Sequence, residues 1–110
     1  MSYDIDIGEH WFNYTYNLAP LFYDHIDAEE GVHRGGLHAL HGLTGKQARE
    51  VLAGAFEAIH RTAYSAESIT VFRRKYDAPN GWGNTDTALI FLARLMAACA
   101  ENPRKKVSVT

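Results

Sequence analysis

The sequence predicts one α+β domain, in which a small antiparallel sheet packs against three to four helices. Two observations carry this prediction. Short segments at both ends of the chain alternate apolar with polar residues, which is the period of a half-buried strand. The longer segments between them repeat apolar residues at helical spacing. A chain of 110 residues can bury its own core, so residues 1–110 are expected to form a single domain.

Three segments are expected to build the sheet. Residues 3–7 alternate apolar and acidic side chains, and residues 12–17 alternate aromatic rings with amide or hydroxyl groups. Residues 8–10 are predicted to join them in a three-residue hairpin loop. The tail, residues 105–109, alternates again and is predicted to form the third strand. The sheet is therefore expected to consist of the N-terminal hairpin and a C-terminal strand.

The tail is predicted to pair antiparallel with the first strand. Such pairing would bring apolar residues together on one face and place acidic residues beside basic or polar ones on the other, a favourable cross-strand match. The expected apolar neighbours are Ile5, Ile7, Val107 and Val109, and the expected polar neighbours are Asp4, Asp6, Lys106 and Ser108.

The first predicted helix covers residues 18–26. Asn17 is expected to be its N-cap, and Pro20 is tolerated in its first turn. Residues 27–36 are acidic and then glycine-rich, which indicates the longest loop of the chain.

Two further helices are expected in the middle of the chain. Thr44 and Gln47 form a capping box, and it opens a helix whose apolar stripe reaches Ile59. Residues 65–76 permit either a short helix or a strand, because several of them are β-branched.

The last helix follows a turn at residues 77–81, where proline, asparagine and glycine favour a chain reversal. Asn84 or Thr85 is expected to cap this helix, which extends to about Glu101. Its apolar residues spread around most of its circumference, as expected for a heavily buried helix.

Composition excludes several classes of protein. The net charge is −2 and the basic run Arg104-Lys105-Lys106 is short, so a nucleic-acid partner is not expected. No apolar run approaches the roughly 20 residues of a membrane span, and the first residues do not resemble a secretory signal. Because Cys99 is the only cysteine, a reduced, cytoplasmic location is expected.

The leading candidate for ligand binding is the polar side of residues 12–17. Side chains on a strand alternate between faces, so Asn13, Thr15 and Asn17 would share one face. Neutral amide and hydroxyl groups can bind polar ligands without the desolvation cost of a charge. The structural alternative is that Asn13 and Thr15 satisfy loop backbone groups while Asn17 caps the next helix. Capping is favoured for Asn17, and both interpretations stay open for the other two.

A second candidate is the Asn80-Gly81-Trp82-Gly83 loop before the last helix. Its glycines would let backbone N–H groups approach a ligand, and Trp82 would supply a ring for stacking. The alternative, which is favoured, is that Trp82 fills the edge of the core. Asn80 and Trp82 complete the set of predicted ligand-binding residues.

Histidines and carboxylates suggest two weaker hypotheses. The histidines at positions 33, 38 and 41 would form a metal site only if residues 37–42 were helical and His33 approached them; solvated or hydrogen-bonded side chains are the favoured interpretation. The acidic residues around His25 are most simply a solvated loop, and they are Asp24, Asp27, Glu29 and Glu30. We expect no catalytic residue, metal site or cofactor.

Three segments occur in a familiar order: residues 13–22 with an Asn-x-Thr-x-Asn start, the Asn-Gly-Trp-Gly loop, and the closing Val107-Ser108-Val109. This order resembles an uncharacterised family of small proteins from actinobacteria and their phages. The resemblance implies a one-domain cytosolic protein of bacteria or phages, and it transfers no catalytic residue or ligand. The stretch from His33 to His41 departs from the family.

The expected function is therefore a non-catalytic module that binds a small polar molecule or interacts with another protein. In a phage setting, it would act on a host protein or a nucleotide signal. Two alternatives stay open: a small enzyme with a histidine and carboxylate site, and a homodimer formed by an aromatic face or the edge strand at residues 12–16.

Overall fold

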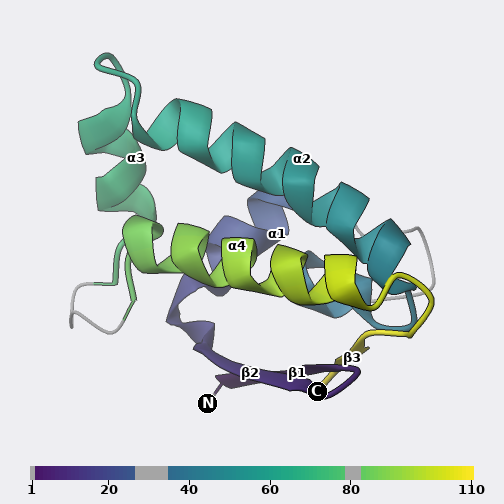
Figure 1. Cartoon of the computed structure of the whole chain (residues 1–110). Helices are drawn as coiled ribbons and strands as arrows, with labels where there is room; N and C mark the ends of the chain where they lie inside the picture. The colour runs from purple at the N-terminus through teal and green to yellow at the C-terminus, as the bar shows by residue number, and fades with distance from the viewer. Residues whose placement is uncertain (1, 27–34, 79–82) are drawn as a thin grey trace.

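The computed structural model describes residues 2–26, 35–78 and 83–110. It confirms the predicted α+β class, with helices stacked on one face of a three-stranded antiparallel sheet (Figure 1). The described elements are β1 (Ser2–Ile7), β2 (His10–Thr15), the 3₁₀ helix η1 (Tyr16–Leu18), α1 (Ala19–His25), the 3₁₀ helix η2 (Gly36–Leu40), α2 (Gly45–Ala63), α3 (Ile69–Tyr76), α4 (Thr85–Glu101) and β3 (Ser108–Val109). None of the described helices is long and apolar enough to cross a membrane.

The sheet has the strand order β2-β1-β3. Strands β1 and β2 pair antiparallel from Ser2 opposite Thr15 to Ile7 opposite His10, so the hairpin loop holds two residues rather than the predicted three. Gly8 occupies its first position with φ +59°. A type II′ hairpin turn needs a positive φ at this position, which glycine adopts without strain.

The pairing of the C-terminal strand β3 with β1 agrees with the prediction in part. Ile5 lies opposite Val109 and Asp6 lies opposite Ser108. The prediction for Asp4 was wrong, because Asp4 exchanges two backbone hydrogen bonds with Thr110 and does not face Lys106.

Lys106 forms a bridge with Thr44 instead. The preceding carbonyl groups of Pro103 and Lys105 accept hydrogen bonds from the Lys46 and Gly45 N–H groups, at 3.1 and 2.8 Å. The start of the tail thus satisfies N–H groups at the first turn of α2, which have no partner within a helix. Only its end is left to pair with β1.

Strand β2 begins and ends two residues earlier than predicted, because the chain coils into η1 after Thr15. The Thr15 hydroxyl accepts a hydrogen bond from the Asn17 N–H at 3.1 Å. A threonine hydroxyl that bonds the backbone two residues further on favours a turn over continued pairing. Asn17 is therefore neither a strand residue nor the N-cap of α1. That cap position belongs to Leu18, which makes no side-chain capping bond.

The predictions for the two long helices are confirmed, and the alternative left open for residues 65–76 is decided. Thr44 and Gln47 form the capping box of α2. Asn84 caps α4, with Thr87 completing a second capping box. Within residues 65–76, the part from Ile69 onward is helical.

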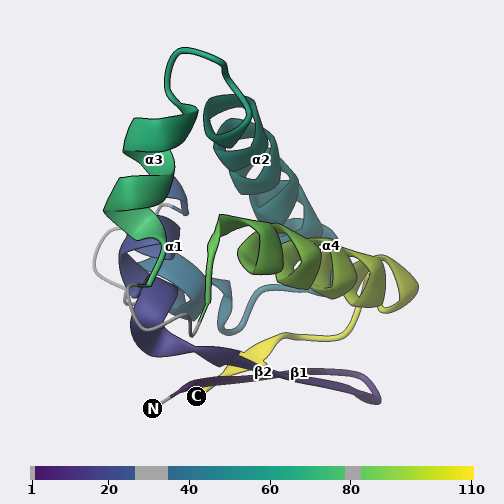
Figure 2. The same cartoon turned by 90° about the vertical axis from the view of Figure 1, so that its left-hand side faces the viewer.

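Helix α4 lies between the sheet and α2, and the two views agree on this arrangement (Figures 1 and 2). The inward residues of β1 and much of α4 are buried. Helix α4 is heavily buried, as expected, but its apolar residue Ile90 is 55% exposed. One side of this central helix therefore faces solvent.

Candidate interaction groove

Asn13, a predicted ligand-binding residue, has its side chain engaged within the sheet. Its Nδ2 group donates to the Ser2 hydroxyl at 2.7 Å and to the Asp4 carboxylate at 3.1 Å, with a longer contact of 3.3 Å to the Tyr3 carbonyl. All three partners belong to β1. The Asn13 amide is therefore a cross-strand link on the outer face, and it does not satisfy loop backbone groups as the structural alternative proposed.

The hydroxyl of Thr15 is likewise used by the chain itself, as the cap of η1. Asn17 lies in η1 and does not share a strand face with Asn13 and Thr15. The predicted row of three polar groups on one strand face is therefore not present, because the strand ends before the third group.

The described end of the second asparagine-containing segment, Gly83, lies against the end of β2. Asn80 and Trp82 lie outside the described residues, but Gly83 at the end of that loop is described. A Cβ atom at Gly83 would lie 2.9 Å from Thr15 Cγ2 and 3.4 Å from Leu18 Cγ. The backbone of Gly83 thus packs directly against the end of β2.

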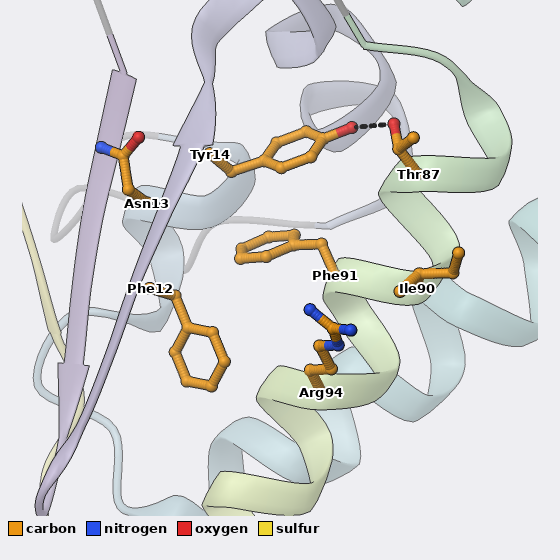
Figure 3. A pocket seen from close by; sticks show the side chains of 7 residues that line it. All are labelled: Phe12, Asn13, Tyr14, Thr87, Ile90, Phe91 and Arg94. Atoms are coloured by element: carbon orange, nitrogen blue, oxygen red, sulfur yellow. Dashed lines mark hydrogen bonds between the residues drawn. The ribbon is translucent and has the colours of Figure 1, made fainter.

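A groove opens between β2 and α4, next to this contact. Its volume is about 300 Å³, and it is lined by Phe12, Asn13, Tyr14, Thr87, Ile90, Phe91 and Arg94. Figure 3 shows the Phe12 and Tyr14 side chains directed toward α4, whereas the Asn13 side chain points away. We call this set of residues the β2–α4 groove.

Aromatic packing shapes one wall of the β2–α4 groove. The rings of Tyr14 and Phe91 are stacked, with centroids 4.6 Å apart, and Phe12 meets Phe91 edge-on at 6.2 Å. Stacked and edge-on ring pairs each stabilise by about 0.5–1.5 kcal/mol beyond their burial. This wall is therefore a firm apolar surface formed by two elements.

The polar groups of the groove are few. The Tyr14 hydroxyl lies 2.8 Å from the Thr87 hydroxyl, and burial raises the pKa of the Tyr14 phenol. The phenol is therefore a neutral hydrogen-bonding group at physiological pH.

Among the described residues, Arg94 is the only charged one that lines the groove. It is exposed, and within the described ranges it has neither a hydrogen bond nor an ion pair. Its neighbours one turn away on α4 are apolar: Ile90, Phe91, Ala97 and Ala98. A guanidinium group in this setting is available to a carboxylate, which it binds through two parallel hydrogen bonds.

The direction of backbone groups in β1 follows from its pairing with β3. Asp4 donates to and accepts from Thr110 at 3.1 and 2.9 Å, so its N–H and C=O point toward β3. Backbone groups of successive strand residues point to opposite sides. Tyr3 and Ile5 therefore bond to β2.

The register then gives the direction of the backbone groups in β2. Tyr14 and Phe12 lie opposite those two β1 residues and bond to them. The N–H and C=O groups of Trp11 and Asn13 consequently point to the outer edge of β2. In the described parts of the chain, no further strand pairs with this edge.

The histidines contact separate parts of the fold. The His25 ring packs against Phe72 and Tyr76, whereas the His38 ring packs against Tyr3 and Tyr16. His25 and His38 thus share no ring contact that would support an enzymatic site.

The metal hypothesis gains no support from these positions. The Nδ1 atom of His41 accepts a hydrogen bond from the Val109 N–H at 3.0 Å, and His33 lies outside the described residues. In the described ranges, no three histidine, cysteine or acidic side chains are placed to hold a metal ion.

Among the acidic residues around His25, Asp24 is described and Asp27, Glu29 and Glu30 are not. The Asp24 carboxylate accepts a hydrogen bond from the Tyr76 hydroxyl at 2.5 Å. This bond lowers the pKa of Asp24, and the nearby Lys75 ammonium lowers it further. Asp24 is therefore an ionised surface group that joins α1 to α3.

Sequence reasoning did not identify the α4 side of the groove. The sequence pattern indicated a buried helix there, and it did not predict a binding role for Thr87, Ile90, Phe91 or Arg94. One signal was present, since Arg94 is the only basic residue of residues 85–101 and stands among apolar neighbours.

Comparison with models of protein families gave no match, and searches of curated proteins and of solved structures found no similar protein. The resemblance to an actinobacterial and phage family therefore stays a prediction, and the function is argued from the geometry of the site.

Proposed function

We propose that this chain is a non-catalytic protein-interaction module whose binding surface is the β2–α4 groove. The observation that carries the proposal is the meeting of three features at one place. They are an aromatic apolar wall, an arginine with no counter-charge in the part of the chain that the structure describes, and the outer edge of a strand. Aromatic and arginine side chains are the residues that most often dominate binding at protein interfaces.

The partner is a protein that presents an apolar side chain and a carboxylate. The apolar group would cover Phe91 and Ile90, while the carboxylate would face Arg94. For a phage product, this partner would be a host protein. The single buried cysteine fits action in a reducing cytoplasm.

A small anionic molecule is the second candidate. The groove volume of about 300 Å³ lies at the lower end of the range for small-molecule sites, roughly 300–1,000 Å³. The edge of β2 favours the protein partner, because a small molecule would leave that row of backbone groups unused.

Affinity capture from an extract of the source organism tests the proposed function. Wild-type protein, Arg94→Glu and the control Arg49→Glu would each be immobilised, and bound proteins would be identified by mass spectrometry. Arg49 is an exposed arginine of α2 outside the groove. Its substitution by glutamate therefore makes the same change of charge at a site away from the groove.

We expect a partner that is retained by wild type and Arg49→Glu and is lost with Arg94→Glu. A partner retained equally by all three proteins would show that the groove is not the binding surface. Circular dichroism spectra of the variants would establish that each is folded.

A further inference from the structure

We propose that the partner binds as a fourth, antiparallel strand on the outer edge of β2, through the sequence apolar–any–acidic. This inference rests on the proposed function and specifies how the partner is recognised. An added strand is a known mode of peptide recognition, in which main-chain hydrogen bonds supply affinity and pockets for alternate side chains supply specificity.

The main chain of β2 sets where the added strand would pair. Trp11 and Asn13 direct their N–H and C=O groups to the outer edge, as the register shows. A residue of the partner opposite each of them would exchange two backbone hydrogen bonds with it. The site therefore offers four main-chain hydrogen bonds over three residues of β2.

The side chains of the added strand would alternate between the two faces of the sheet. Residues opposite Asn13 and Trp11 would point to the outer face, as those two side chains do. Residues opposite Phe12 and Tyr14 would point to the inner face, which is the face that α4 covers. The groove would thus receive two side chains of the partner, two positions apart.

The groove is not uniform along its length, and this gives the two positions different chemistry. Tyr14 and Thr87 are bonded at one end. Arg94 lies toward the other end, on the Phe12 side of Phe91 (Figure 3). An apolar side chain therefore fits opposite Tyr14, and a carboxylate fits opposite Phe12.

The strand direction converts these positions into a sequence. In an antiparallel pair, the residue opposite Tyr14 precedes the residue opposite Phe12 by two positions. The recognised segment therefore reads apolar, any residue, then aspartate or glutamate.

A second copy of this chain does not fit that description. Strand β2 has the sequence His-Trp-Phe-Asn-Tyr-Thr and contains no acidic residue. Pairing of β2 with the same strand of another copy would leave Arg94 without a carboxylate from that strand. The charge of the groove thus favours a different protein.

A designed peptide tests the proposal directly. The probe is acetyl-Thr-Thr-Leu-Thr-Glu-Thr-Thr-amide with a fluorescent label, because threonine favours the extended conformation. Its matched control moves the glutamate one position, next to the leucine. A shift of one residue sends a side chain to the opposite face of a strand, so no register places both groups of the control in the groove. Binding would be measured by fluorescence anisotropy and mapped by NMR amide shifts.

We expect the probe to bind the wild-type protein about tenfold more tightly than the control peptide, which is the usual effect of one charged hydrogen-bonded pair. Amide shifts should centre on residues 11–14 and 87–94. The variant Arg94→Glu should lose the preference and should prefer a probe with lysine in place of glutamate, whereas Arg49→Glu should bind as wild type.

The contribution of the main chain has its own control. The threonine between leucine and glutamate would lie opposite Asn13, and N-methylation of this residue removes its hydrogen-bond donor. We expect this peptide to lose at least about tenfold in affinity. Equal binding of the methylated peptide, or of the control with displaced glutamate, would overturn strand addition.

The two proposals fail in different ways. Groove-dependent capture of a partner, together with no peptide binding at a concentration of about 1 mM (a binding free energy of about −4 kcal/mol), would overturn this inference and leave the proposed function intact. If the partner is captured equally well by the Arg94→Glu variant, both proposals are overturned. A dimer in light scattering that is broken by substitutions in β2 would also overturn the inference, because a second copy would then occupy the edge.

Discussion

The hydroxyl groups of Tyr14 and Thr87 lie 2.8 Å apart and join the edge strand β2 to the first turn of α4. The Thr87 hydroxyl also donates to the Asn84 carbonyl at 2.9 Å and accepts from the Asn84 N–H at 3.1 Å. Because a hydroxyl has one hydrogen and two lone pairs, Tyr14 must be the donor of its bond. Thr87 is thus fully satisfied, and it connects the wall of the groove to the cap of α4.

Tyr14→Phe removes one hydrogen bond and keeps the ring. We expect the free energy of unfolding to fall by about 1 kcal/mol, the usual net value of such a bond, as measured by urea denaturation. Thr87→Val should cost more, because it also removes the capping box of α4. A double-mutant cycle should show coupling between the two residues. Additive effects would indicate that the bond does not form in solution.

Two glycines of α2 should respond to alanine in opposite ways. A Cβ atom at Gly45 would lie 2.1 Å from the Asn102 carbonyl oxygen, whereas a Cβ atom at Gly54 would have no neighbour within 4 Å. We expect Gly45→Ala to destabilise by about 1–3 kcal/mol through overpacking. Gly54→Ala should stabilise by about 0.5–1 kcal/mol, because alanine is the better helix former. Thermal unfolding of both variants checks the contrast, and equal shifts would contradict the close approach of α2 to the end of α4.

The ion pair between Arg73 and Asp86 should make the free energy of unfolding depend on pH. Arg73 donates to both carboxylate oxygens of Asp86 at 3.0 Å, and these bonds lower the pKa of Asp86. The Asp86 side chain is 48% exposed, so the pair should contribute only about 0.5–1 kcal/mol. Asp86→Asn should lose that amount at pH 7.

The sign of the pH effect follows from the lowered pKa. The contribution is complete above the ordinary aspartate pKa, about 3.9, and it is lost as the pH falls through the lower value of the folded protein. The difference between wild type and Asp86→Asn should therefore shrink below about pH 4. A difference that stayed constant into strong acid would exclude a role for ionised Asp86.

Cys99 should be unreactive in the folded protein. Burial raises the pKa of its thiol to about 11, so at pH 8 only roughly one thiol in a thousand would be ionised. The thiolate is the reactive form. We expect negligible alkylation by iodoacetamide in buffer and rapid alkylation in concentrated urea, followed by intact-mass spectrometry. Fast labelling under native conditions would show that the end of α4 opens.

The variant Asn13→Ala should distinguish the role of the Asn13 side chain from the role of the Asn13 backbone. The amide bonds to Ser2 and Asp4 would be lost, and we expect the free energy of unfolding to fall by about 0.5–1 kcal/mol. Binding of the peptide probe should be unchanged, because only the Asn13 backbone faces the edge. A large loss of affinity in a variant that stays folded would show that the Asn13 side chain takes part in binding.

Local patterns were sufficient for most of the secondary structure. The capping box at Thr44 and the cap at Asn84 depend on groups within a few residues, so each can be identified from neighbouring letters. The pairing of Ile5 with Val109 was also predictable, because a one-residue slip would have moved apolar side chains to the solvent face.

The amino-acid sequence by itself determined the α+β class, the capping of the long helices and the apolar face of the sheet, because each of these depends on residues that are close together in the sequence. The tertiary structure alone decided which groups are left for a partner. Asn13 and Thr15 are polar in any conformation, but folding commits the amide to β1 and the hydroxyl to the turn at η1. Tyr14 and Arg94 stand 80 positions apart in the sequence, and only the packing of α4 against β2 brings them to one groove.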